Sequence, residues 1–298
     1  MRTKFWLTVF VLAIFGVWQG TALADDPAQP GGAQTQAATE SGRHASGPMI
    51  HRSSEISGFY VYDNKDVKLG KLDNLMIDAH TGQVLYGILD TGLFGKNIPV
   101  PCAALQMKVV DNKHRWLLNK TKDELGNART LGARRYADFA NEEWRRGIDT
   151  FFGVHTAART TTPEGETETA LAREPMFFDS SRLARFKVLN PQNDHLGKVD
   201  DLIIDISAGQ VLYGIVDSGV SGKRIAVPWG AFRLSKEAEG DNYWLTLDKS
   251  KDQLASAPTF DTNQWPDFAN EDWRNSVDRF YGVRTAAQPR SEGIEEPR

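Results

Sequence analysis

Cysteine is almost absent from this chain, because Cys102 is the only one among 298 residues. One thiol cannot form an intramolecular disulfide, so buried apolar side chains must hold each folded copy together. The sequence also lacks an excess of positive charge, since its formal net charge is -4. A mildly acidic protein has no broad positive field for phosphate backbones, and nucleic acid is therefore excluded as the expected partner.

Motifs that carry chemistry are missing as well. The six histidines include no HxxxH or HExxH pair for zinc, and no GxSxG nucleophile elbow occurs. The Gly-x-x-Gly-Lys stretches at residues 92–96 and 219–223 are too short for a phosphate-binding loop and lack the following Ser or Thr. Cys102 could be a nucleophile, but a small packing residue is the better interpretation. We therefore expect a protein that is not an enzyme and holds no cofactor or metal.

The N-terminus has the three features of a signal peptide. Arg2 and Lys4 supply positive charge, residues 5–18 form a short apolar run, and Ala22 and Ala24 supply a cleavage pattern. We predict a signal peptide over residues 1–24 and a mature protein in the periplasm or outside the cell, where it could associate with the envelope. The alternative is an uncleaved anchor, although the run is short for a membrane span of about 20 residues. No later run approaches that length, so no further membrane helix is expected.

An internal repeat is the strongest feature of the sequence. Residues 69–104 and 196–231 align without a gap, and about 22 of the 36 positions are identical, which indicates a duplicated unit. The match continues from Trp116-Leu117 to Trp244-Leu245 and into both C-terminal parts. The period of 127 residues, from residue 69 to residue 196, corresponds to a whole domain rather than to a solenoid unit. We expect domains at residues 51–155 and 175–284, each with its own apolar interior, a leader at 25–50, a linker at 156–174 and a tail at 285–298.

The first part of each copy has the pattern of β-structure. Residues 71–78 and 83–90, repeated at 198–205 and 210–217, read as a hairpin around a glycine turn. Their nearly continuous apolar character predicts strands covered on both faces. Residues 98–100 add a strand in which Pro99 indicates an edge or a bulge. Residues 107–109 with 116–118, and 232–234 with 244–246, complete about six short strands per copy, typical of a small barrel or sandwich.

The end of each copy has a helical pattern. Asn141 and Asn270 are the expected N-caps, and both are followed by acidic residues that suit the helix dipole. Apolar residues recur on one helical face, and Gly153 or Gly282 follows at the expected C′ position. We expect each stripe to pack on its own barrel, and the alternative is an exposed aromatic face that docks a partner. The stripes consist of Trp144, Ile148, Phe151 and Phe152, and of Trp273, Val277, Phe280 and Tyr281.

Ten residues make up the repeated structural motif. They are Gly70, Asp78, Gly82, Tyr86 and Asp90 in the first copy, and Gly197, Asp205, Gly209, Tyr213 and Asp217 in the second. Paired carboxylates could bind calcium or act as acid and base. These aspartates are spread over two strands, however, and do not alternate around a glycine as calcium ligands do. We expect Asp78 and Asp205 to accept hydrogen bonds from backbone N–H groups of the turn.

The two copies resemble the PRC-barrel domain family. The resemblance rests on LGKxDxLxID, on GQVLYGIxD and on Val227-Pro228-Trp229. It implies the fold shared by the cytoplasmic part of the photosynthetic reaction centre H subunit and by a domain of the ribosome maturation factors. Residues 250–282 are similar to an extension of many bacterial members, from which the first copy departs at residues 128–130 and 136–138 and at Cys102. The predicted fold class is mainly β, with two tandem PRC-type barrels, each followed by a short amphipathic helix.

The resemblance implies a binding or assembly module, and not a known reaction. We expect an exported protein whose two barrels present related surfaces to a protein partner, with Phe94, Trp229 and Trp265 as the candidate contact residues because these aromatics are specific to one copy. Trp116, Trp144, Trp244 and Trp273 recur and are assigned to the cores. One alternative is a small-ligand carrier or an enzyme that uses a groove between the copies. Another is an accessory role related to proteins like the reaction centre H subunit, with which the predicted export is at odds.

Overall fold

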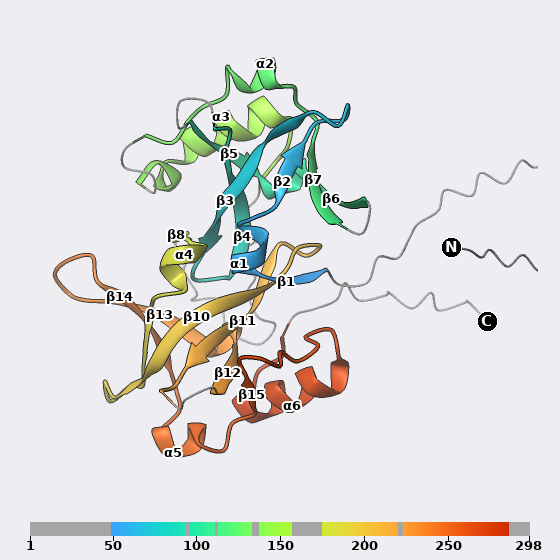
Figure 1. The fold of residues 1–298 in the computed structure, drawn as a ribbon. Coiled ribbons are helices and arrows are strands. Elements are labelled where there is room, and N and C mark those ends of the chain that lie inside the picture. Colours follow the sequence, from blue (N-terminus) through green and yellow to red (C-terminus); the bar gives the residue numbers. More distant parts are fainter. Residues whose placement is uncertain are drawn as a thin grey trace, which may run out of the picture. The chain divides into compact units, whose positions relative to one another are not determined.

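The computed structural model describes residues 49–92, 96–110, 113–132, 137–156, 175–219 and 223–285 (Figure 1). We call residues 49–156 the first copy and residues 175–285 the second. The expected signal peptide and nearly all of the expected leader, linker and tail lie outside the described residues, as does Phe94. In the part of the chain that is described, no helix combines the length and the apolar character needed to cross a membrane.

The two copies contain the same succession of strands and helices as far as α2 and α5, after which the next element is a 3₁₀ helix in the first and a strand in the second. The first has β1 (Ile50–Arg52), α1 (Ser53–Ile56), β2 (Tyr60–Tyr62), β3 (Lys68–Asp78), β4 (Gln83–Asp90), β5 (Asn97–Pro101), η1 (Cys102–Ala104), β6 (Leu105–Val110), β7 (Lys113–Leu118), α2 (Lys122–Leu125), η2 (Ala137–Ala140) and α3 (Glu142–Phe152). The second has β8 (Phe177–Asp179), α4 (Ser180–Leu183), β9 (Lys187–Leu189), β10 (His195–Asp205), β11 (Gln210–Asp217), β12 (Lys223–Pro228), η3 (Trp229–Ala231), β13 (Phe232–Lys236), β14 (Tyr243–Leu247), α5 (Lys251–Leu254), β15 (Thr259–Asp261) and α6 (Glu271–Tyr281).

The predicted hairpins are confirmed. β3 pairs antiparallel with β4, and β10 with β11, in matching registers that close at Asp78↔Gln83 and Asp205↔Gln210. Both first strands begin three residues before the predicted start. Among the described strands β5 pairs with β4 alone, so Pro99 lies on an edge strand as expected.

The described strands form one sheet that passes through both copies and does not close. Its main path runs β13-β14-β9-β10-β11-β4-β3-β2-β7-β6, so the two hairpins lie at its centre. Most pairs are antiparallel, but β2 runs parallel to β7 and β9 runs parallel to β14. The prediction of mainly β-structure is confirmed, while the sheet is mixed and open rather than two closed cylinders.

The copies exchange their first strands. β1 of the first copy pairs with β10 of the second, and β8 of the second copy pairs with β3 of the first (Figure 1). The two hairpin turns also meet, because the Val84 amide donates to the Gly209 carbonyl at 2.8 Å and the Val211 amide donates to the Gly82 carbonyl at 2.9 Å. Each copy therefore completes the sheet of the other.

The apolar interior is likewise shared. One cluster of buried side chains contains Leu75 and Ile77 from the first copy together with Ile203 and Ile204 from the second. A smaller cluster beneath α3 contains Phe177, which belongs to the second copy. The expectation that each copy folds around its own interior is wrong, because exchanged strands carry apolar residues across the boundary.

The long C-terminal helices agree with the sequence pattern. Asn141 caps α3 by accepting from the Trp144 amide at 3.0 Å, and Asn270 caps α6 by accepting from the Trp273 amide at 2.9 Å. Gly153 and Gly282 end these helices with φ values of 69° and 70°, in the left-handed region that suits glycine. Ile148 and Val277 are fully buried, so the predicted packing of the stripes is confirmed.

The alignment of Trp116 with Trp244 is wrong. Val61 pairs with Trp116 in the first copy, and its counterpart Val188 pairs with Leu245 in the second. The structural counterpart of Trp116 is therefore Leu245. Trp116 is buried as expected, whereas Trp244 is only half-buried and lies outside the core clusters. The shift arises because six residues separate β13 from β14, a longer connection than that between β6 and β7.

Candidate functional site

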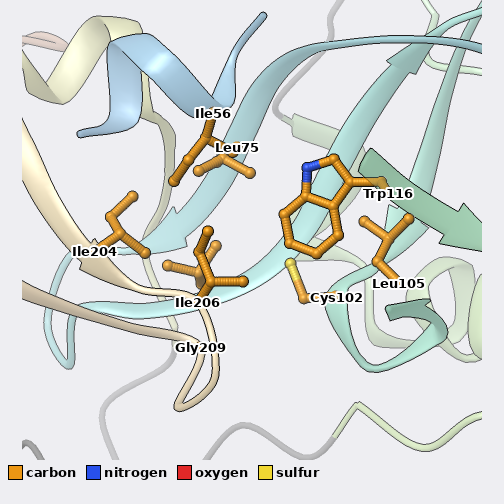
Figure 2. Close-up of a pocket in the computed structure, with 9 residues that line it drawn as sticks. Ile56, Leu75, Cys102, Leu105, Trp116, Ile204, Ile206 and Gly209 are labelled. Atoms are coloured by element: carbon orange, nitrogen blue, oxygen red, sulfur yellow. The ribbon is translucent and has the colours of Figure 1, made fainter. Parts of the chain in front are cut away.

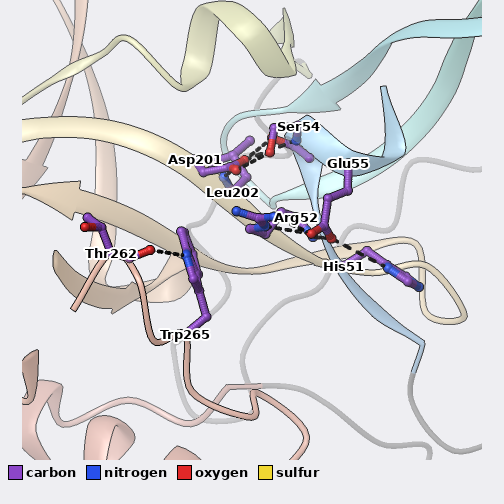
Figure 3. A network of polar contacts seen from close by, with 9 residues as sticks. His51, Arg52, Ser54, Glu55, Asp201, Leu202, Thr262 and Trp265 are labelled. Carbon is purple, nitrogen blue, oxygen red and sulfur yellow. Dashed lines mark hydrogen bonds and ion pairs between the residues drawn. The ribbon is translucent and has the colours of Figure 1, made fainter. Parts of the chain in front are cut away.

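A groove of about 230 Å³ lies between the exchanged N-terminal strand and the C-terminal extension of the second copy (Figure 3). β1 and α1 supply one wall with Ile50, His51, Arg52 and Glu55. The opposite wall follows β15 and contains Trp265, Pro266 and Phe268, and Ile203 of β10 also lines the groove. A concave surface that combines apolar side chains with polar groups is typical of a binding site.

Trp265 is fixed by both its nitrogen and its ring. The indole Nε1 donates to the Thr262 carbonyl at 2.9 Å, and the ring centroid lies 5.1 Å from that of Phe260 and 6.2 Å from that of Phe268. The side chain stays half-buried. Because its N–H is already paired, Trp265 offers an apolar ring to a ligand rather than a hydrogen-bond donor.

Arg52 lies over the Trp265 ring, with its guanidinium carbon 4.7 Å from the ring centroid. Nε donates to Glu55 Oε1 at 2.9 Å, and Nη2 donates to the same oxygen. This arginine stands at the N-cap of α1, where Ser, Thr, Asp or Asn is preferred and positive charge is unfavourable. Its counterpart Asp179 caps α4 by accepting from the Arg182 amide at 2.8 Å. Arg52 therefore departs from the residue types preferred at an N-cap, and it lines the groove.

His51 joins the groove to the first copy. Its ring centroid lies 4.6 Å from that of His114 on β7 and 5.8 Å from that of Phe59. Burial, followed by the charge of His114, lowers the pKa of His51 below its usual value. Burial alone would raise the pKa of Glu55, but its hydrogen bonds to Arg52 and the arginine charge outweigh burial and lower it. A neutral imidazole and a closed Arg52–Glu55 pair leave the groove with no net charge near neutral pH.

The corresponding place in the first copy carries a larger side chain on the exchanged strand. Phe177 occupies the position of Ile50 and is 7% exposed. The ring centroid of Phe177 lies 5.7 Å from that of Phe139. The Arg145 guanidinium carbon lies 5.2 Å from the same Phe177 centroid. Residue 136, the counterpart of Trp265, is outside the described part. The exchanged strands of the two copies therefore differ in the size and contacts of the side chain at this position.

A family model for the PRC-barrel domain matches residues 49–125 and 176–254, which together are more than half of the chain. The chain belongs to the PRC-barrel family. The matched segments correspond to the two copies and confirm a tandem pair. No curated protein matches the chain at a significant level. Trp265, Pro266 and Phe268 lie beyond the second matched segment, so one wall of the groove is built by the extension and not by the PRC-barrel domain itself.

The three predicted contact residues have different fates. Trp265 lines the groove, while Phe94 lies outside the described residues. Trp229 is only 4% exposed and is packed against the hairpin turn of the other PRC-barrel copy, so it faces no external partner. The specific aromatic at residue 229 thus contributes to the contact between the copies rather than to an outer surface.

The repeated aspartates are turn residues. Asp78 Oδ1 accepts from the His80 amide at 3.1 Å, and Asp205 Oδ1 accepts from the Ser207 amide at 2.9 Å, as predicted. Asp90 and Asp217 accept from the Gly92 and Gly219 amides at 2.8 and 2.9 Å. Asp78 also accepts from the Met176 amide of the exchanged segment at 3.1 Å. In the described residues no three His, Cys, Asp or Glu side chains are grouped so as to hold a metal ion.

The repeated glycines permit close backbone approach. A Cβ on Gly70 would clash with the Asp90 carbonyl, and a Cβ on Gly197 would clash with the Asp217 carbonyl. Gly82 and Gly209 have φ values of 73° and 61° at the two turns that meet between the PRC-barrel copies. The most similar part of the sequence therefore builds the hairpins and their mutual contact.

The repeated tyrosines contact the long helices in different ways, Tyr86 through its hydroxyl and Tyr213 through its ring, which lies 5.5 Å from that of Trp273. The Tyr86 hydroxyl lies 3.3 Å from Asp149 Oδ1, and burial together with the nearby Asp149 charge raises the pKa of Tyr86. Burial also raises the pKa of Tyr213 to about 12. Asp149 accepts from the Thr156 amide at 2.8 Å, and Asp278 accepts from the Thr285 amide at 2.7 Å. Thr156 follows Asp149 by seven residues, and Thr285 follows Asp278 by the same number. This equal spacing is the signal that could have revealed the two hydrogen bonds.

Proposed function

We propose that the chain is an exported, non-catalytic binding and assembly protein that holds a protein partner in the groove beside Trp265. The observation that carries this proposal is Arg52, which occupies an unfavourable cap position and lies over Trp265, a tryptophan that the first copy replaces with tyrosine. Departures from local sequence preference concentrate at functional sites. The PRC-barrel pair supplies the rigid support on which this site is mounted.

The groove favours an extended segment with an apolar side chain. Trp265, Phe268 and Ile203 form the apolar wall, and the paired Arg52 and Glu55 supply both donor and acceptor groups at the rim. Trp and Arg are enriched among the residues that dominate binding energy at protein interfaces. The volume of about 230 Å³ suits one or two side chains rather than a large cofactor.

Export is supported by the N-terminal sequence. Arg2 and Lys4 precede the apolar run at residues 5–18, and Ala24 ends a cleavage pattern. Mass spectrometry of the protein from the periplasmic or extracellular fraction should find Asp25 as the new N-terminus. An intact Met1 or Arg2 terminus in the cytoplasmic fraction would disprove export.

Site-specific photo-cross-linking in the native host tests the binding site. A photoreactive residue at position 265 should yield a discrete adduct, while the same residue at position 244 should not, because Trp244 is half-buried but lies outside the groove. The adduct should weaken about tenfold in Arg52→Ala, the effect of losing a contact worth about 1.4 kcal/mol. Equal adducts at both positions, or an adduct indifferent to Arg52, would reject the groove as the partner site.

A further inference from the structure

A second, partly enclosed space lies where the two copies meet (Figure 2). It has a volume of about 40 Å³ and lies apart from the groove beside Trp265. The first copy lines it with Ile56, Leu75, Cys102 and Trp116, and the second copy lines it with Ile204 and Ile206. No lining side chain carries a charge, so the cavity suits a neutral molecule.

The cavity arises because the copies place their tryptophans differently. In the second copy Trp229 packs against Gly82 of the opposite turn, and Leu245 occupies the neighbouring core position. In the first copy the tryptophan is at the Leu245 position, as Trp116, and Cys102 replaces Trp229. Trp116 and Cys102 fill the space less completely than Trp229 and Leu245 do. The cavity is the space that remains.

This exchange brings an unpaired polar group into the core. Trp116 is 5% exposed, and its Nε1 has no hydrogen-bond partner. Figure 2 shows the nitrogen edge of the ring turned toward Leu75 and Ile56, which also line the cavity. A buried N–H without a partner costs free energy that an acceptor in the cavity would recover. Burial raises the pKa of Cys102 to about 12, so its thiol stays neutral beside that acceptor.

We propose that this cavity is a binding site for a small neutral organic molecule that has one acceptor oxygen and no donor. The oxygen accepts from Trp116 Nε1, and the carbon atoms contact the aliphatic side chains of both copies. A water molecule is a weaker match, since a buried water typically makes about three hydrogen bonds and the lining side chains offer only the indole N–H and the weakly polar thiol. The volume corresponds to about three water-sized groups, which suits a molecule of about three or four heavy atoms.

Indole N–H resonances of the full chain provide the test. Acetone has one acceptor oxygen and no donor, and xenon, which has no acceptor, is the comparison probe. Acetone should shift the Trp116 Nε1–H resonance, identified by its loss in Trp116→Phe, along a saturable curve and leave every other tryptophan resonance unmoved. Xenon should bind without the same downfield shift. Trp116→Phe should weaken acetone binding about tenfold and keep xenon binding.

The outcomes separate the proposal from its rivals. A saturable, Trp116-specific shift supports it. Unsaturable shifts that are equal at every indole would overturn it, and so would a strong water-to-Nε1–H cross-relaxation signal that acetone does not displace, because a resident water would then satisfy the donor. If Trp116→Phe fails to fold, sequential assignment of the wild-type protein identifies the Trp116 Nε1–H resonance, and the wild-type titration still decides the question. Because the groove beside Trp265 is not involved, this test and the cross-linking test fail independently.

Discussion

Ser54 of the first copy donates from its hydroxyl to Asp201 Oδ2 of the second copy at 2.5 Å (Figure 3). Ser53 donates to Oδ1 of the same carboxylate at 2.6 Å. The repeat-related contact joins Asn74 to Ser180, whose hydroxyl donates to Asn74 Oδ1 at 2.5 Å. A polar residue in each long strand thus anchors the serines of the helix that enters from the other copy, and the exchange of strands is fastened twice.

Asp201→Ala should therefore weaken the whole fold. The substitution leaves the hydroxyls of Ser53 and Ser54 without their acceptor, and the expected loss in the free energy of unfolding is about 2 kcal/mol. Asp201→Asn is the matched control, because asparagine stands at the equivalent Asn74 and should cost less than about 1 kcal/mol. Chemical denaturation measures both. An alanine variant as stable as the asparagine variant would show that the anchor contributes little.

Cutting the chain between the copies should not separate them. A protease site placed within residues 157–174 would yield one fragment that carries β1 and one that carries β8, and each strand is paired with the other fragment. Because the apolar cluster also spans both fragments, they should elute together in size-exclusion chromatography at the position of the uncut chain. Two separate peaks after complete cleavage would contradict the shared core.

Two glycines in equivalent turns should respond unequally to alanine. At both Gly82 and Gly209 the positive φ costs a non-glycine residue about 1 kcal/mol. A Cβ at Gly82 would also clash with the Trp229 ring and come within 2.7 Å of Gln210 Nε2, whereas at Gly209 the nearest atom is the Val84 carbonyl oxygen at 3.5 Å. Gly82→Ala should lose about 2 kcal/mol more than Gly209→Ala in urea unfolding. Equal losses would mean that Trp229 moves freely.

The two substitutions that convert the first copy to the tryptophan arrangement of the second should be tolerated only when they are made together. Cys102→Trp alone should overfill the space next to Trp116, and Trp116→Leu alone should enlarge the cavity, so each should destabilise the protein by about 1–3 kcal/mol. The double variant recreates the Trp229 and Leu245 arrangement of the second copy. It should recover at least about 1 kcal/mol relative to the sum of the single changes in a double-mutant cycle. If the two changes in the free energy of unfolding simply add, the two side chains do not compensate for each other's size.

His51 should make stability depend on pH below neutrality. Because its pKa is lower in the folded protein than the usual 6.5, the unfolded chain binds this proton more readily. Its contribution to stability is complete above about pH 6.5 and is lost as the pH falls through the folded pKa. His114, Glu55 and Arg52 are the titratable or charged groups in this contact network.

His51→Phe, which copies Phe178 of the second repeat, should reduce the loss of unfolding free energy between pH 7.5 and pH 5.5. His114→Phe should reduce it too, because His114 contributes to the lowered pKa of His51. An unchanged pH dependence in both variants would place its origin elsewhere. The pH range lies above the region in which Glu55 titrates, since the pKa of Glu55 is lowered from 4.5.

Much of each copy was predictable because its signals are local. The glycine turn at Gly82, the Asn141 cap and the left-handed Gly153 each follow from preferences within a few residues. The exchange of β1 and β8 was not predictable, since three-residue strands carry no useful periodicity and either partner sheet offers the same backbone groups. The Trp116 misalignment had a similar cause, because sequence identity at tryptophan outweighed a difference in turn length.

The candidate site was predicted in only one residue, Trp265. Arg52 was missed because its meaning depends on α1, a helix of four residues that no sequence pattern marks. Trp229 was misassigned, since a tryptophan found in one copy alone can equally serve an inner or an outer surface. The sequence alone could not show that Trp229 would pack against the hairpin turn of the other copy.

The exchange of strands within one chain has a consequence for how such a protein can change. In a dimer of identical subunits each substitution occurs twice, so a harmful effect at one contact is doubled at its mate. In this chain the two equivalent contacts are made by different residues of one sequence, so each contact can change on its own. Ile50 can differ from Phe177, and Cys102 from Trp229, while the opposite side keeps the tighter packing and sustains the fold. The second copy can therefore maintain the stability of the fold while substitutions in the first copy create new grooves or cavities.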